Sequence, residues 1–167
     1  MNSIIMDWLK LAFFDLFNSV DRDLIDRGVH ENCINHRLAV WLEKHRPEKF
    51  SDYYVDVEFN KNGDEEKIVY DEKNKKRYIR PDIIVHKRTK DASDNLIAIE
   101  CKKYLDSDWD ISKLAQLKSG KYEYSHCIAV KYMPRADSFF IKFAQDGFGE
   151  KEIKKDLSNW DSALEKL

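Results

Sequence analysis

The sequence contains little cysteine, glycine or proline, with three, five and three residues of these types among 167. The cysteines, Cys33, Cys101 and Cys127, have neither a CxxC motif nor the Cys/His spacing of a metal site. We therefore interpret them as free thiols in a reducing cytosol. No internal repeat and no Pro/Gly/Ser-rich linker divides the chain. We expect one domain over residues 1–167, which is long enough for a substantial hydrophobic core.

Neither sign of charge dominates, since 29 basic and 31 acidic residues give a net charge of −2. The lack of a general basic field argues against a protein that coats nucleic acid, although an acidic cluster can offset a local basic surface. Long apolar runs are also missing, because Asp7, Lys10 and Asp15 interrupt the apolar N-terminal segment, which has no basic region before it. We therefore expect no signal peptide and no membrane span, and a cytoplasmic location.

The segment MNSIIMDWLKLAFFDLFNSV predicts an unusually apolar helix within a helical extension over residues 1–27. Its large apolar residues exceed one ordinary helix face: Trp8, Leu9, Phe13, Phe14 and Phe17. Such a helix packs on the core of its own chain or on a partner subunit. Core burial is the commoner arrangement, because large exposed apolar faces are rare. We expect core packing for most of this helix and a homodimer interface for part of its surface.

Apolar periodicity in the rest of the chain predicts helices and strands in mixed order. Helices are expected over Val29–His45, over Asp110–Lys118 and within 150–167, where one stripe contains Ile153, Leu157, Trp160, Leu164 and Leu167. Strands are expected at Tyr53–Phe59, Lys67–Tyr70, Tyr78–Val85, Asn95–Lys103, His126–Tyr132 and Ser138–Phe143. The fold class is therefore mixed, α/β or α+β, and the Asp110–Lys118 helix allows a parallel crossover.

Two acids and a lysine on neighbouring strands form the main candidate site. Residues two apart in a strand share a face, so Glu100 and Lys102 project together while Cys101 points away. A hairpin centred on Asp91 would place Asp82 directly opposite Glu100, with Cβ atoms roughly 4.5–5.5 Å apart. Two carboxylates that close repel each other unless a cation lies between them.

Glu31 is a further acidic candidate, because it shares a helical face with Ile34 and Leu38. A carboxylate on an apolar stripe is costly without a partner or a metal. The same residue could instead lie at the helix N-terminus and interact favourably with the helix dipole.

Phosphodiester hydrolysis explains this set of residues. Carboxylates bind Mg²⁺ or Mn²⁺, the metal activates water and neutralises phosphate charge, and a nearby lysine orients the water or stabilises the transition state. The motifs Pro81-Asp82 in RPDIIVH and Glu100-Cys101-Lys102 in LIAIECKK resemble those of the PD-(D/E)XK nuclease superfamily. The similarity runs from about Glu31 to Val130, through the helix DISKLAQL.

This resemblance implies a restriction endonuclease-like fold, a central mixed sheet flanked by helices, with a nuclease core over residues 28–135. It implies Asp82, Glu100 and the Cys101 backbone carbonyl as metal ligands and Lys102 as the catalytic lysine. Family members often carry a helical acid near the metals, and Glu31 matches that position. The implied substrate is nucleic acid, DNA more than RNA, in defence against foreign DNA. The alternative is a catalytically inactive module on the same fold that binds nucleic acid or protein.

Four other residues are weaker candidates for nucleic-acid contact. Lys113 and Gln116 share a helix face and could approach phosphate, although each is more often a solvated helix residue. Lys87 and Arg88 belong to a small basic patch in a polar connection, where a solvated loop is at least as good an interpretation.

Overall fold

The computed structural model of this chain describes residues 3–104 and 108–165 and is built on one six-stranded mixed sheet. The strand order is β1-β6-β7-β8-β9-β10, and β7 and β8 are parallel while the other pairs are antiparallel. These strands are β1 (Tyr54–Val57), β6 (Ile83–His86), β7 (Asn95–Lys102), β8 (His126–Lys131), β9 (Ser138–Phe143) and β10 (Glu150–Lys154). The predicted mixed α+β class is confirmed.

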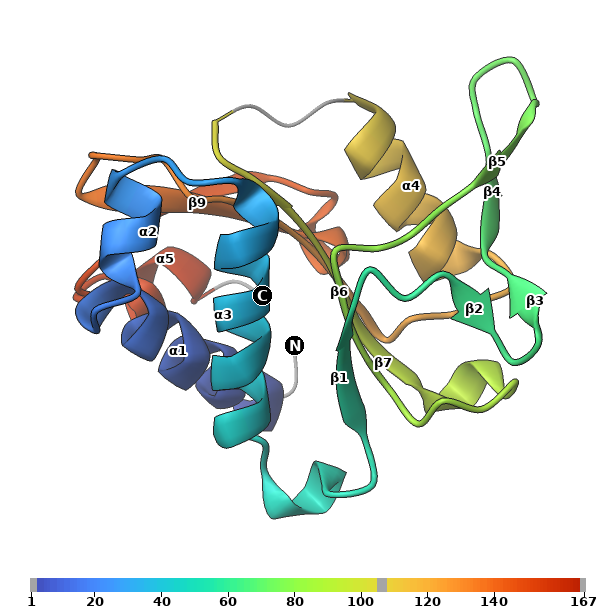
Figure 1. Cartoon of the computed structure of the whole chain (residues 1–167), viewed down its shortest axis with the longest axis horizontal. Helices are drawn as coiled ribbons and strands as arrows, with labels where there is room; N and C mark the ends of the chain where they lie inside the picture. The colour runs from blue at the N-terminus through green and yellow to red at the C-terminus, as the bar shows by residue number, and fades with distance from the viewer. Residues whose placement is uncertain (1–2, 105–107, 166–167) are drawn as a thin grey trace.

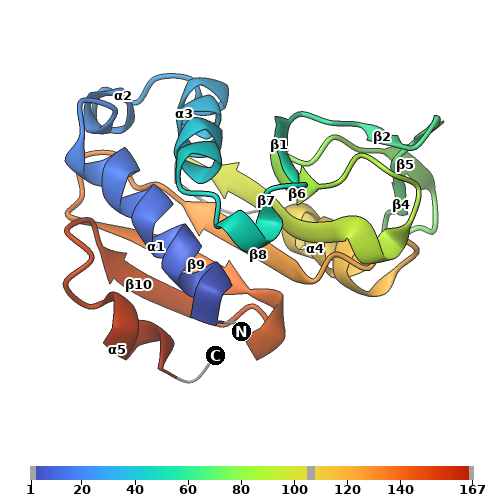
Figure 2. The ribbon, with the colours of Figure 1, turned by 90° about the horizontal axis from the view of Figure 1, so that it is seen from below.

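Helices cover both faces of the sheet (Figures 1 and 2). One face packs against α1 (Ser3–Asn18), α3 (Glu31–Lys44) and α5 (Trp160–Leu164), which share a hydrophobic cluster with all the strands from β6 to β10. The short α2 (Arg22–Asp26) joins α1 to α3. The other face packs against α4 (Asp108–Ser119), which forms the crossover between β7 and β8. The expected helical crossover between parallel strands is therefore present.

Two small hairpins lie outside the main sheet. The first pairs β2 (Lys61–Asn62) with β3 (Glu65–Glu66), and the second pairs β4 (Ile68–Tyr70) with β5 (Lys76–Tyr78). Figure 1 shows the β4–β5 hairpin projecting beyond α4 at the upper right. The strand expected over Tyr78–Val85 is therefore interrupted, since β5 ends at Tyr78 and β6 begins at Ile83. Pro81 lies in this gap and cannot donate a ladder hydrogen bond.

The N-terminal helix α1 is part of the core and is not an extension appended to it. Its buried residues are Ile5, Trp8, Leu9, Ala12, Phe13, Leu16 and Phe17. The ring of Phe13 lies 5.1 Å from that of Phe139 on β9 and 6.0 Å from that of Trp160 on α5. Ile4, Leu11 and Phe14 remain exposed, and the homodimer interface stays a prediction. Among the helices in the described ranges, none is long and apolar enough to cross a membrane.

The prediction of a helix within 150–167 is wrong for the first half of this range. Glu150–Lys154 is strand β10, paired antiparallel with β9, and only Trp160–Leu164 is helical. Glu152 and Lys154 are exposed while Ile153 is buried, which is the alternation of a strand. Leu157 has a φ of 57°, so the backbone turns there and cannot continue a helix. Leu167 lies outside the described residues. The sheet therefore extends past residue 135, where the core had been expected to end.

Candidate functional site

The hairpin formed by β6 and β7 brings the two predicted carboxylates to adjacent positions. Ile83 pairs with Ile99 across the antiparallel strands, so the next position along the ladder sets Asp82 opposite Glu100. The register predicted from the sequence is therefore confirmed. Asp82 lies just before β6, and its Oδ2 accepts a hydrogen bond of 2.7 Å from the N–H of Cys101. This bond holds the Asp82 carboxylate against β7.

Asp82, Glu100 and Lys102 share the side of the sheet that α4 covers. Ile84 and Ala98, which alternate in step with them, belong to the hydrophobic cluster beneath α4. Paired strands of the sheet, rather than a surface loop, thus fix the positions of Glu100 and Lys102.

Glu100 is almost completely buried, with 2% of its surface exposed. Its Oε2 lies 2.6 Å from the ammonium of Lys113 on α4, while its Oε1 is buried without a hydrogen-bond partner among the described residues. Burial raises the pKa of Glu100 to about 8; Lys113 opposes this increase and the nearby Asp82 carboxylate adds to it. Burial also raises the pKa of Asp82, against the hydrogen bond from Cys101. The positive charge near Asp82 and Glu100 is therefore not enough to offset the burial of both carboxyl groups.

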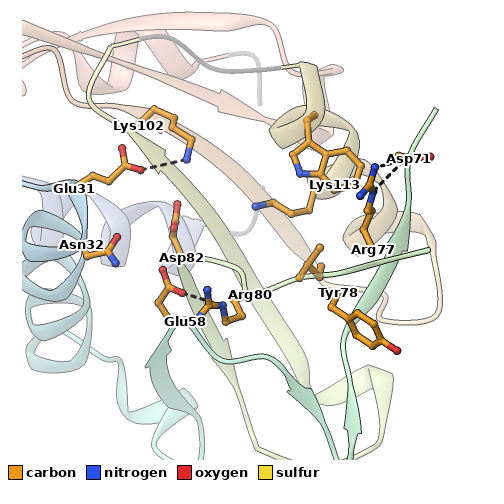
Figure 3. Close-up of a pocket in the computed structure, with 12 residues that line it drawn as sticks. Glu31, Asn32, Glu58, Asp71, Arg77, Tyr78, Arg80, Asp82, Lys102 and Lys113 are labelled. Carbon is orange, nitrogen blue, oxygen red and sulfur yellow. Dashed lines mark hydrogen bonds and ion pairs between the residues drawn. The ribbon is translucent and has the colours of Figure 1, made fainter. Parts of the chain in front are cut away.

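Lys102 and Glu31 connect the sheet to α3. The Lys102 ammonium lies 3.4 Å from Oε1 of Glu31, and Figure 3 shows the two side chains pointing toward each other. Burial opposes ionisation of Lys102, but the carboxylates around it, Asp110 and Asp82 first, outweigh burial and raise its pKa. Glu31 is the first residue of α3, so it occupies the helix N-terminus and also faces the site. Both interpretations of Glu31 from the sequence are compatible with this position.

These side chains line a pocket of about 620 Å³ between α3, α4 and the β4–β5 hairpin. Its lining residues are Glu31, Asn32, Glu58, Asp71, Arg77, Tyr78, Ile79, Arg80, Asp82, Lys102, Trp109 and Lys113. Sequence reasoning missed Arg77, Arg80 and Trp109 here. The signal for the first two was present, because the basic run KNKKRYIR directly precedes Pro81-Asp82.

The structure separates the four weaker candidates. Lys113 is buried and paired with Glu100, so it belongs to the site and is not a solvated helix residue. The Gln116 side chain instead bonds the backbone of Tyr70 in β4 through both its oxygen and its nitrogen.

Lys87 and Arg88 follow the end of β6 that is opposite to Asp82. Lys87 pairs with Asp52 and Asp94, and Arg88 pairs with Asp56. Gln116, Lys87 and Arg88 do not line the pocket, so the structure gives them no place in this site.

The donor chemistry of the site fits a hard cation such as Mg²⁺. Asp82 and Glu100 offer adjacent carboxylate oxygens, and Oε1 of Glu100 lacks any partner among the described residues, as expected for a position that a cation would satisfy. Within the part of the chain that the structure describes, no three His, Cys, Asp or Glu side chains form a group that could hold a metal. Glu31 lies across the pocket, beside Lys102. The Cys101 carbonyl stays a predicted ligand.

Comparisons with family models, with curated proteins and with solved structures find no match for this chain.

Proposed function

We propose that this chain is a metal-dependent nuclease of the PD-(D/E)XK type, with a restriction endonuclease-like fold, that hydrolyses phosphodiester bonds in DNA in preference to RNA. The observation that carries the proposal is the buried Glu100 carboxylate, whose Oε1 has no partner among the described residues and which lies opposite Asp82. Burying two neighbouring acids destabilises a fold. A bound cation gives a physical reason for keeping them there.

The proposed roles follow from where the side chains lie. Asp82 and Glu100 would hold Mg²⁺ or Mn²⁺, with the Cys101 carbonyl and Glu31 as further oxygen donors. The ion would supply charge neutralisation at the phosphate and a water of lowered pKa. Lys102, with its raised pKa, stays protonated at neutral pH and presents its ammonium to the same pocket. That ammonium would orient the attacking water or stabilise negative charge on the phosphate.

The fold supports the proposal through its order of elements. A helix carrying Glu31 precedes a β6–β7 hairpin carrying Asp82, Glu100 and Lys102, and α4 then crosses to the parallel strand β8. The order agrees with the arrangement that the motif resemblance implies. Defence against foreign DNA is the biological role that we infer from the same resemblance.

One observation favours a second function, that of a binding module without catalysis. The Lys113 ammonium already lies 2.6 Å from Glu100 and 3.6 Å from Asp110, so it supplies positive charge where a metal would. In this alternative, the basic and aromatic residues of the pocket bind nucleic acid or protein and no bond is broken.

Incubation with nucleic acids distinguishes the two functions. The purified protein is mixed with single- and double-stranded DNA and RNA in Mg²⁺, in Mn²⁺ or in EDTA. We expect cleavage of at least one substrate with metal and none in EDTA. Binding without cleavage on every substrate would favour the binding module.

A further inference from the structure

The segment from Ile68 to Arg80, here called the basic arm, concentrates positive charge beside the pocket. Residues 71–80 contain five of the 29 basic residues and only two of the 31 acidic ones. Lys73, Lys75 and Lys76 are exposed, and none of them forms an ion pair with another described residue. Most other basic side chains near the surface are neutralised, as Lys87 and Arg88 are. Free positive charge is therefore gathered on this arm.

The basic arm is anchored to the body of the protein. Gln116 on α4 accepts a hydrogen bond of 2.8 Å from the Tyr70 N–H and donates one of 2.7 Å to the Tyr70 carbonyl. The Tyr122 hydroxyl makes the equivalent pair of bonds to the backbone of Ile68. At the tip, the Asp71 carboxylate accepts hydrogen bonds from the backbone N–H groups of Lys73 and Lys75 and from the side chain of Arg77 on β5. The lysines are therefore presented by a fixed hairpin.

A second, smaller hollow adjoins the pocket where the basic arm meets α4. It measures about 270 Å³ and shares Asp71, Arg77 and Trp109 with the larger pocket. Trp109 is partly buried and lines both hollows from the first turn of α4. The guanidinium of Arg77 is held by Asp71 at 2.8 Å, and Figure 3 shows this pair on the side of the pocket away from Glu31. The aromatic ring of Trp109 and the guanidinium of Arg77 therefore both line the junction of the two hollows.

We propose that this smaller hollow is a subsite for an unpaired nucleobase, so that the substrate of the site is single-stranded nucleic acid. The base stacks on Trp109, the adjoining phosphates contact Arg77 and the arm lysines, and the next phosphate enters the pocket of Asp82. Stacking on an aromatic side chain together with a basic track for the backbone is the general mode of single-strand binding. A base inside a duplex is covered on both faces by its neighbours and cannot offer one to Trp109.

This inference rests on the proposed function for its substrate, but its test measures binding alone. A fluorescein-labelled oligonucleotide, as DNA and as RNA, is titrated in EDTA with wild type, Trp109→Phe and Trp109→Leu. Both substitutions keep an apolar side chain, and only phenylalanine keeps an aromatic face. We expect Trp109→Leu to weaken single-strand binding by about 5- to 150-fold, the range typical for loss of one stacked base, and Trp109→Phe to weaken it less. The matching duplex should bind more weakly than the single strand.

The arm lysines are tested by the salt dependence of the same binding. Lys73→Ala/Lys75→Ala should lower the slope of log affinity against log salt by about 1.4, since each phosphate contact on a single strand contributes about 0.7. Lys49→Ala/Lys154→Ala removes the same charge from exposed positions outside both hollows and should leave the slope unchanged.

Equal binding by Trp109→Leu and Trp109→Phe, or a duplex that binds as tightly as the single strand, would overturn the subsite. Equal slopes for the two double variants would overturn the role of the arm. If the protein cleaves no nucleic acid but these differences are found, the nuclease proposal fails and the single-strand subsite stands. If the protein cleaves nucleic acid but binds the duplex most tightly, the nuclease proposal stands and the single-strand subsite fails.

Discussion

Replacing Lys113 with methionine tests the electrostatics of the buried acid pair. The side chains of Lys113 and Glu100 are 10% and 2% exposed, and their charged atoms lie 2.6 Å apart. Removing one partner of a buried ion pair usually destabilises a protein by about 3–5 kcal/mol. We expect a smaller loss here. The pKa of Glu100 is already raised to about 8, so the carboxyl that loses Lys113 can take up a proton.

The sign of the pH dependence follows from this raised pKa. The pKa of Glu100 is 4.5 in its ordinary state and about 8 in the folded protein. Between these two pH values, Glu100 is protonated in the folded protein and ionised in the unfolded chain. Stability without metal therefore falls as pH rises through this window. Lys113→Met raises the folded pKa further, so the fall continues above pH 8. At pH 6, the free energy of unfolding of the variant should be about 1 kcal/mol lower than that of the wild type, because one hydrogen bond is lost. This difference should grow by about 1.4 kcal/mol for each pH unit above 8.

Urea denaturation in EDTA at pH 6 and pH 9 measures these differences. The control is Glu100→Gln/Lys113→Met, which has no carboxyl at position 100, so the extra loss at pH 9 should disappear. A loss for Lys113→Met that is the same at both pH values would refute the assignment of a raised pKa to Glu100. A stable variant with no loss at either pH would show that the pair contributes nothing.

Three further predictions concern Lys102, Glu31 and α1. Lys102→Ala should reduce cleavage by about 10²–10³-fold, as loss of one transition-state contact does. Its Mn²⁺ affinity, measured by calorimetry, should change much less, because an ammonium is not a ligand. An equal loss of cleavage and of Mn²⁺ affinity would contradict the role of Lys102. Glu31→Gln should weaken Mn²⁺ binding or cleavage, and no change in either would leave Glu31 as a helix-end charge. Light scattering at micromolar concentration should show a dimer that Leu11→Glu/Phe14→Glu dissociates, since both side chains are exposed on α1; a monomeric wild type would end this prediction.

The β6–β7 hairpin could be predicted from the sequence because its determinants are local. Its two apolar runs are joined by a polar segment over residues 87–94, and the confirmed register places Asp82 opposite Glu100. Strand alternation then places Lys102 on the same face without further information.

The C-terminal region could not be predicted in the same way. Ile153, Leu157, Trp160 and Leu164 have the spacing of one helical stripe, yet Ile153 is in a strand because β9 offers an open edge. That pairing is a tertiary contact, and periodicity within one segment does not report it. The place of the basic arm beside the pocket was missed for a similar reason, since it depends on bonds between Gln116 and Tyr70, which are 46 residues apart.

The most direct test of the proposed function compares two carboxylates that line the same pocket. Asp82→Asn removes a proposed metal ligand, while Glu58→Gln removes one negative charge from a partly exposed residue paired with Arg80. Both variants and the wild type are assayed for cleavage of labelled single- and double-stranded DNA in Mg²⁺ and Mn²⁺. We predict metal-dependent cleavage by the wild type and by Glu58→Gln, and none by Asp82→Asn. Equal cleavage by all three proteins, or loss of activity in Glu58→Gln alone, would contradict a metal centre at Asp82 and Glu100.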